Sequence, residues 1–222
     1  MELALKAIQE KPRLLHIEKP LCTPDLRGVD EFKEAMSRNP QTIVTVGYDH
    51  AVAESVEAVA DLARQGLFGN IITLDVEFRE HWRGIFGAHP WLAGPWETYL
   101  GYWRRGGGAG GEHSHALHLW QYFARALGWG SITDSKAMFD MREEQGAEYD
   151  RLAAFLVRSK GGMGRAVQDV ITYPVKKWAR LQGDKGFIEW HCNGAPEGDL
   201  IRYQIEGENP AEKVFAKKRP DD

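Results

Sequence analysis

The sequence has few cysteines, no long apolar run and no excess of basic residues. Only two of its 222 residues are cysteines, Cys22 and Cys192, which is too few for a disulfide framework and indicates a reducing, cytoplasmic location. No apolar run approaches the roughly 20 residues of a membrane-spanning helix. The formal net charge of −4 argues against nucleic-acid and membrane-surface binding, because both functions favour basic clusters.

The first third of the sequence alternates between helical and strand patterns. Residues 2–10 predict an amphipathic helix and not a signal peptide, because acids occur early in the segment. Apolar strands are predicted at 13–17 and 42–47, and helices at 29–38 and 51–65. Short apolar strands separated by helices are typical of a parallel sheet that is covered on both faces. The predicted apolar stripe of the last helix consists of Val52, Val56, Val59 and Ala63.

After Gly69 the pattern changes to the two-residue period of β-strands. The segment IITLDVEFRE alternates apolar with polar residues and predicts a half-buried strand of an antiparallel sheet. Its apolar residues are Ile72, Leu74, Val76 and Phe78. Further strands are predicted at 131–140, 151–159, 165–172, 176–183, 186–191 and 199–206, with hairpin turns at 161–162 and 183–186. One helix, at 112–127, interrupts this series.

These elements predict a fold of the α/β plus α+β class. A fragment of a doubly wound, Rossmann-type parallel sheet comes first. A larger, mainly antiparallel open β-sheet domain follows, with one flanking helix that we expect to form an active-site wall.

The tripeptide Glu18-Lys19-Pro20 follows the first predicted strand. Ligands of open parallel sheets bind where loops leave the carboxyl ends of strands, and Lys19 lies at such an end. Pro20 favours an extended Lys19 and allows a cis peptide. A lysine beside a cofactor can hydrogen-bond a substrate hydroxyl and help its proton to leave. The alternative is a strand-ending turn with a solvated charge pair.

A glycine cluster at residues 106–111 satisfies the dinucleotide pattern G-x-G-x-x-G, and Asp134 follows at roughly the right distance. That fingerprint needs a buried strand directly before it, whereas WETYLGYWRR is aromatic and basic. We therefore do not predict a dinucleotide site here. The helix after the cluster has a polar stripe, formed by Glu112, His115, His118 and Tyr122.

Three interpretations of this stripe remain open. Glu and His residues at helical spacing can share a metal ion, but no further compact ligand cluster is evident, and no metal is predicted. One histidine could instead act as a general base or orient a hydroxyl group. The third interpretation is that the histidines are structural. The residues of the metal interpretation are Glu112, His113, His115 and His118.

The segment after the first long strand, REHWRGIFGAHPWLAGP, is rich in aromatic and polar residues, among them His81 and Trp82. The related segment WETYLGYWRR contains Arg104. Aromatic faces beside hydrogen-bonding groups suit polyols and carbohydrates, which have apolar C–H faces and hydroxyl edges. The alternative is an ordinary packed loop.

Taken in order, these segments resemble the glucose–fructose oxidoreductase/inositol dehydrogenase/MocA family. The match runs from HIEKPL through TIVTVGYDH, QGLFGNI and the glycine loop with its histidine helix to DVITYPVKKWARLQGDKGFIEW, over about residues 2–206. The series of matches, in this order, is specific for the family, whereas no single motif would be. The resemblance implies NAD or NADP as cofactor and hydride transfer involving a sugar, a polyol or a related carbinol.

The resemblance also implies roles for individual residues. Lys19 would contact the nicotinamide ribose and the substrate, and it would be catalytic together with His115. The segment 112–115 is one residue shorter than the usual family spacing, which leaves His118 as the alternative histidine. Further cofactor contacts would come from Glu18, Pro20 and Tyr48. Substrate contacts would come from Glu112, His118, Tyr122, His81, Trp82 and Arg104.

By the same resemblance, residues 1–49 would be the C-terminal part of a Rossmann domain without its G-x-G-x-x-G unit. Residues 50–216 would be the α+β substrate and oligomerisation domain, and 217–222 a tail. We therefore expect a truncated chain that binds NAD(P) weakly on its own and forms a homo-oligomer through its sheet. The alternative hypothesis is a non-catalytic remnant that self-associates or binds a sugar-like ligand. A third hypothesis is a metal-dependent sugar enzyme.

Overall fold

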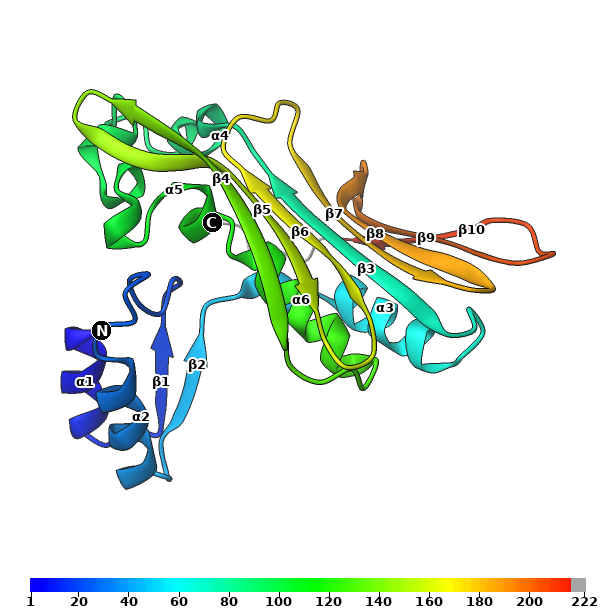
Figure 1. Ribbon diagram of the computed structural model, residues 1–222, viewed down its shortest axis with the longest axis horizontal. Coiled ribbons are helices and arrows are strands. Elements are labelled where there is room, and N and C mark those ends of the chain that lie inside the picture. The colour runs from blue at the N-terminus through cyan, green and yellow to red at the C-terminus, as the bar shows by residue number, and fades with distance from the viewer. Residues whose placement is uncertain (217–222) are drawn as a thin grey trace.

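The computed structural model describes residues 1–216 and contains two separate β-sheets (Figure 1). The tail predicted at 217–222 lies outside the described residues. The small sheet pairs β1 (Leu14–Ile17) in parallel with β2 (Ile43–Val46), and α1 (Glu2–Gln9) and α2 (Val29–Arg38) accompany it. These elements confirm the alternating pattern of the first third.

The small sheet is covered on one face only, which corrects the expectation of cover on both faces. Ile8 and Phe32 from the two helices form a small core against the inner strand residues. On the other face, Leu14 and Ile43 are more than half exposed, because no helix among residues 1–216 packs there.

The segment predicted as one helix at 51–65 begins as a 3₁₀ turn, η1 (Asp49–Val52), and continues as α3 (Glu54–Arg64). Val56, Val59 and Ala63 are buried as predicted. Val52 is exposed, because the tighter turn of η1 places it outside the α-helical stripe.

The large sheet has eight strands in the order β10-β9-β8-β7-β3-β6-β5-β4. All neighbours are antiparallel except β3 and β6, which are parallel, so the prediction of a mainly antiparallel sheet is confirmed. Its strands are β3 (Ile71–Arg79), β4 (Asp134–Glu144), β5 (Ala147–Arg158), β6 (Met163–Asp169), β7 (Lys176–Gly183), β8 (Gly186–Ala195), β9 (Gly198–Ile205) and β10 (Ala211–Ala216).

The prediction of this sheet was wrong in two places. The hairpin of β4 and β5 turns at Gln145–Gly146, where both residues have positive φ. Glutamine is an unusual residue for such a turn, so the sequence pattern missed it. β10 was not predicted.

Helices α3 and α6 (His115–Ala126) cover one face of the large sheet (Figure 1). Trp120 of α6 is fully buried, and its indole N–H donates to the Leu74 carbonyl at 2.7 Å. Val76 and Phe78 are buried as predicted, whereas Ile72 is 53% exposed, because a bulge at the start of β3 turns it outward and buries Ile71 instead.

The helix predicted at 112–127 is α6, which begins at His115; Glu112 instead ends a separate short helix, α5 (Gly108–Glu112), and residues 113–114 lie between the two. α4 (Trp82–Gly87) and three 3₁₀ turns, η2 (Pro95–Glu97), η3 (Tyr99–Gly101) and η4 (Trp103–Arg105), lie at the same end of the sheet. They pack with α5 around a second apolar cluster that includes Trp82 and Tyr149. Among the helices of residues 1–216, none is long and apolar enough to cross a membrane.

Candidate active site

Helix α5 opens the candidate site and is hydrogen-bonded to the sheet by two buried side chains. The N–H of Gly110 donates to Asp150 Oδ2 at 2.7 Å, and Gln168 Nε2 donates to the carbonyls of Ala109 and Gly110 at 3.3 Å. Gly108 has a φ of +77°, and a Cβ there would overlap the Asp150 carboxylate. The glycine cluster therefore lets the backbone approach β5 and β6 closely.

Lys19 lies at the carboxyl end of β1 and is held by Glu112, at the end of α5. Its Nζ donates to the Glu112 carboxylate at 2.9 Å and to the Glu112 main-chain carbonyl at 2.8 Å. The two side chains are only 11% and 20% exposed. The Lys19–Pro20 peptide is cis, as the sequence allowed. An ammonium group has three N–H donors, so the described contacts leave one for a ligand.

His115 begins α6 and faces η1 across the crevice. Its Nδ1 lies 3.7 Å from Asp49 Oδ1, and its ring makes an edge contact with His50 at 5.0 Å and stacks on Phe78. The side chain is 11% exposed. Burial, followed by electrostatic interaction with His50 and Lys19, lowers the pKa of His115 to about 3, so the imidazole is neutral at neutral pH.

The neighbouring histidines of this segment have different surroundings. His118 stacks on Tyr48 with ring centroids 4.0 Å apart, and burial lowers its pKa. His113 is almost fully buried, and burial together with the charge of Lys177 lowers its pKa to about 4. His113 and His115 line the crevice, whereas His118 does not.

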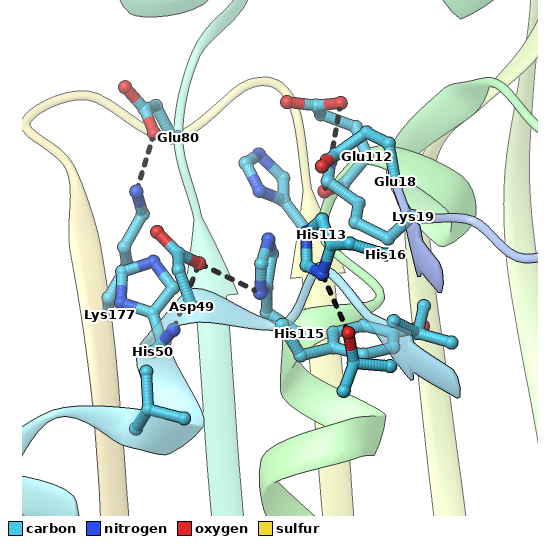
Figure 2. A pocket seen from close by; sticks show the side chains of 15 residues that line it. His16, Glu18, Lys19, Asp49, His50, Glu80, Glu112, His113, His115 and Lys177 are labelled. Carbon is cyan, nitrogen blue, oxygen red and sulfur yellow. Dashed lines mark hydrogen bonds and ion pairs between the residues drawn. The ribbon is translucent and has the colours of Figure 1, made fainter. Parts of the chain in front are cut away.

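The crevice has a volume of about 690 Å³ and lies between the ends of β1 and β2 and the large sheet (Figure 2). Four carboxylates and two lysines line it, together with four histidines. Lys19 pairs with Glu112, and Lys177 pairs with Glu80 at 3.0 Å. The charged and histidine residues of the lining are His16, Glu18, Lys19, Asp49, His50, Glu80, Glu112, His113, His115 and Lys177.

Of the predicted site residues, Glu18, Lys19, Tyr48, Glu112 and His115 line one crevice. Pro20 lines a neighbouring pocket of about 600 Å³, which glycines of the 106–111 cluster also line. His118 does not line the crevice but stacks on Tyr48, which does.

Four predicted substrate contacts lie elsewhere in the fold. His81 accepts a hydrogen bond from the Arg83 N–H at the start of α4, and Trp82 packs in the second apolar cluster. Arg104 is exposed and stacks over Trp103. Tyr122 packs at the edge of the main core. Their residue types suit a sugar site, but the fold uses them for packing and capping.

The sequence reasoning missed Asp49, His50, Glu80 and Lys177. Asp49 and His50 directly follow β2, so the strand-end argument that selected Lys19 also applies to them. Glu80 follows β3, and Lys177 lies at the start of β7, which pairs with β3. Only the strand pairing reveals that these two residues meet.

The four residues of the metal interpretation, Glu112, His113, His115 and His118, do not form one group of side chains at metal-ligand spacing. Among residues 1–216, the side chains at metal-ligand spacing are Asp49, His50 and His115, whose ligand atoms lie within 4.8 Å of one another. Only His115 belongs to the predicted set.

Comparisons with known proteins identify solved structures with the same fold. No known family model and no curated protein sequence matches the chain. An inositol dehydrogenase homologue from Azotobacter vinelandii, solved with NAD+, matches 96% of the chain with a TM-score of 0.78 and 18% identity. The WlbA dehydrogenase from Bordetella pertussis, in complex with NADH and UDP-GlcNAcA, matches 85% with a TM-score of 0.65 and 21% identity. An aldose-aldose oxidoreductase from Caulobacter crescentus, complexed with glycerol, matches 99% with a TM-score of 0.74 and 17% identity.

The chain therefore has the fold of part of a dinucleotide-dependent oxidoreductase. More narrowly, it is folded like inositol dehydrogenase and related oxidoreductases of the glucose–fructose oxidoreductase/inositol dehydrogenase/MocA type, which confirms the resemblance at the level of the fold. It spans between 53% and 61% of the length of these three structures.

Proposed function

We propose that this chain provides the substrate side of an NAD(P)-dependent oxidoreductase that acts on a sugar, a polyol or a related carbinol. The observation that carries the proposal is Lys19, whose ammonium group is held by Glu112 opposite the neutral imidazole of His115 in one crevice. A donor and a neutral imidazole suit a hydroxyl group, which both donates and accepts hydrogen bonds.

The described residues fit the nicotinamide half of a dinucleotide. Lys19 and Tyr48 lie at the carboxyl ends of β1 and β2, where ligands of open parallel sheets bind. The glycine cluster does not suit the pyrophosphate, because the N–H of Gly107 donates to the Tyr102 carbonyl and that of Gly110 to Asp150. The excess of carboxylates in the crevice also disfavours phosphate groups there.

A bound nicotinamide would accept or supply the hydride at its C4 carbon. Lys19 would direct its remaining N–H at the substrate hydroxyl oxygen and stabilise negative charge that develops there. His115 would accept the hydroxyl proton through the lone pair of its neutral imidazole. Because burial lowers its pKa to about 3, this transfer would depend on stabilisation of the imidazolium. Asp49, 3.7 Å from Nδ1, would then stabilise the imidazolium that forms.

Polyol binding to the polypeptide tests the substrate side of this proposal. We expect myo-inositol, glycerol or an aldose to perturb the NMR signals of residues lining the crevice, and Lys19→Met to weaken that binding at least about tenfold, the cost of one or two charge-assisted hydrogen bonds. Lys136→Met, on the exposed strand β4, serves as the control. Perturbations confined to residues outside the crevice would contradict the proposal.

Turnover is tested by fusing this chain behind the part of the Azotobacter vinelandii homologue that it does not cover. The fusion should reduce NAD+ with a polyol or sugar substrate. Lys19→Met should lower turnover by roughly 100-fold or more, the usual effect of losing an acid–base group. Equal turnover in the variant would assign the proton chemistry to another residue.

Self-association is a second candidate function, and the open face of the large sheet favours it. No helix among residues 1–216 covers that face (Figure 1). Met138 and Leu156 are exposed on β4 and β5. In the centre, the face also carries ion pairs such as Asp75–Arg165, so an interface there would be partly polar.

A further inference from the structure

We propose that Asp49, His50 and His115 form a binding site for a divalent transition-metal cation, with Zn²⁺ as the best match. Their ligand atoms all lie within 4.8 Å of one another. Two of the residues follow β2 and the third begins α6, so the fold brings together segments that are about 65 positions apart in sequence. Two imidazoles and one carboxylate are the ligand set of catalytic zinc sites that keep a position open for water or substrate.

His115 is the rigid member of this site. Its Nδ1 is buried and has no hydrogen-bond partner among residues 1–216. It faces Asp49 Oδ1 at 3.7 Å, which is too long for a hydrogen bond (Figure 2). Buried polar atoms in native structures normally have a partner, and a cation between imidazole and carboxylate would provide one.

Small side-chain movements would complete the coordination. With metal–ligand bonds of about 2.0–2.1 Å, tetrahedral geometry places the ligand atoms about 3.3 Å apart, slightly less than the present Asp49–His115 separation. The Asp49 side chain is 65% exposed, and Figure 2 shows it directed toward the His115 ring. Its Oδ1 also accepts a hydrogen bond from the His50 N–H at 2.9 Å, which holds the carboxylate on this side of the crevice.

The carboxylates of the crevice lining favour a cation, whereas the ammonium group of Lys19 acts on His115 in the opposite direction. Lys19 and Lys177 are each paired with a glutamate, and two further carboxylates, those of Glu18 and Asp49, line the crevice. A crevice with an excess of negative charge raises the local concentration of cations. The open coordination position would face the crevice, where a water molecule or a hydroxyl oxygen could occupy it. With Zn²⁺ on Nδ1, His115 would be a ligand and no longer the proton acceptor, so the proton-accepting role proposed above applies to the metal-free chain.

Metal binding is measured on the full polypeptide after chelator treatment, so the test does not depend on the proposed oxidoreductase activity. Titration calorimetry with Zn²⁺ alone should show one ion per chain with a dissociation constant in the micromolar range or tighter. His50→Ala and His115→Ala should each weaken binding by roughly 100-fold, since losing even a group that supports a ligand costs 10–100-fold. Co²⁺ should give visible d–d absorption that the same variants abolish.

His16→Ala is the matched control, because His16 lines the same crevice and is hydrogen-bonded to Thr45 instead. It should bind Zn²⁺ as the unchanged chain does. If His115→Ala fails to fold, as judged by circular dichroism, His50→Ala and Asp49→Asn decide the question. The proposal is overturned if Zn²⁺ binds no tighter than millimolar, if binding survives both His50→Ala and Asp49→Asn, or if His16→Ala weakens it equally.

Discussion

Asp150 should make the stability of this protein fall as the pH rises from about 4 to about 6. Burial raises the pKa of its carboxyl group to about 6 in the folded chain, from an ordinary value of 3.8. Between these two values the folded state holds a proton that the unfolded state has lost, so stability decreases with pH. A rise of this size in the pKa corresponds to about 3 kcal/mol. The hydrogen bond from the Gly110 N–H opposes the rise but does not cancel it.

The Asp150→Asn variant isolates this contribution. Asparagine keeps an oxygen that can accept from Gly110 and has no charge to bury. Between pH 4 and pH 7 the unfolding free energy of the wild-type chain should fall by about 3 kcal/mol more than that of Asp150→Asn. Both are measured by urea unfolding at closely spaced pH values.

Glu143→Gln, on exposed β4, controls for the loss of a surface carboxylate. Parallel pH profiles for the unchanged chain and Asp150→Asn would refute the reasoning, because they would show that Asp150 titrates at the same pH in both states. A variant profile that falls more steeply than that of the unchanged chain would refute it as well.

Three further predictions concern the glycine loop, the cofactor and the assembly. Gly108→Ala should destabilise the fold by about 1–3 kcal/mol more than Gly128→Ala, because both glycines have positive φ but only the first would meet a side chain, that of Asp150. Equal melting temperatures would contradict this. The chain alone should bind NAD(H) and NADP(H) no tighter than the millimolar range, about 4 kcal/mol, and a micromolar dissociation constant in a calorimetric titration with the four nucleotides would revive the glycine cluster as a phosphate site. Light scattering at tens of micromolar should give a dimer or tetramer, and a monodisperse monomer would refute pairing through the sheet.

Much of the fold could be predicted because local pattern and tertiary packing agree. Leu74, Val76 and Phe78 alternate in the sequence and all point into the core. Prediction was wrong where a local irregularity shifts the pattern. The bulge at Ile71 turns Ile72 outward, and the turn at Gln145 lacks the usual Asn or Asp. Periodicity cannot reveal the bulge, because it depends on pairing with β7, which is distant in sequence.

The candidate site was predictable to the extent that it lies at strand ends. Lys19 and His115 were found from a strand end and a helix stripe, and the fold places both on one crevice. Tyr122 was grouped with them because it lies on the same predicted helical stripe as His115. Both residues do lie on α6, but Tyr122 is further along the helix by roughly 10 Å at about 1.5 Å per residue, and it packs against the core instead of the crevice. Contacts between distant segments, such as Glu80 with Lys177, leave no trace in a single sequence.

The buried carboxylate of Asp150 and the crevice lysine belong to one connected unit. Asp150 holds Gly110 from the sheet side, and Glu112, two residues further along α5, holds Lys19 through its side chain and its carbonyl. A charge that is costly to bury therefore sits directly behind the helix that positions the ammonium group. If Gly110 is released, the Glu112 carbonyl loses its fixed position, and Lys19 loses one of its two described acceptors. Gly108→Ala should therefore change the position of the Lys19 ammonium group as well as lower stability. The added methyl group would contact Asp150 and not the crevice, so any effect on Lys19 would have to pass through Asp150, Gly110 and Glu112.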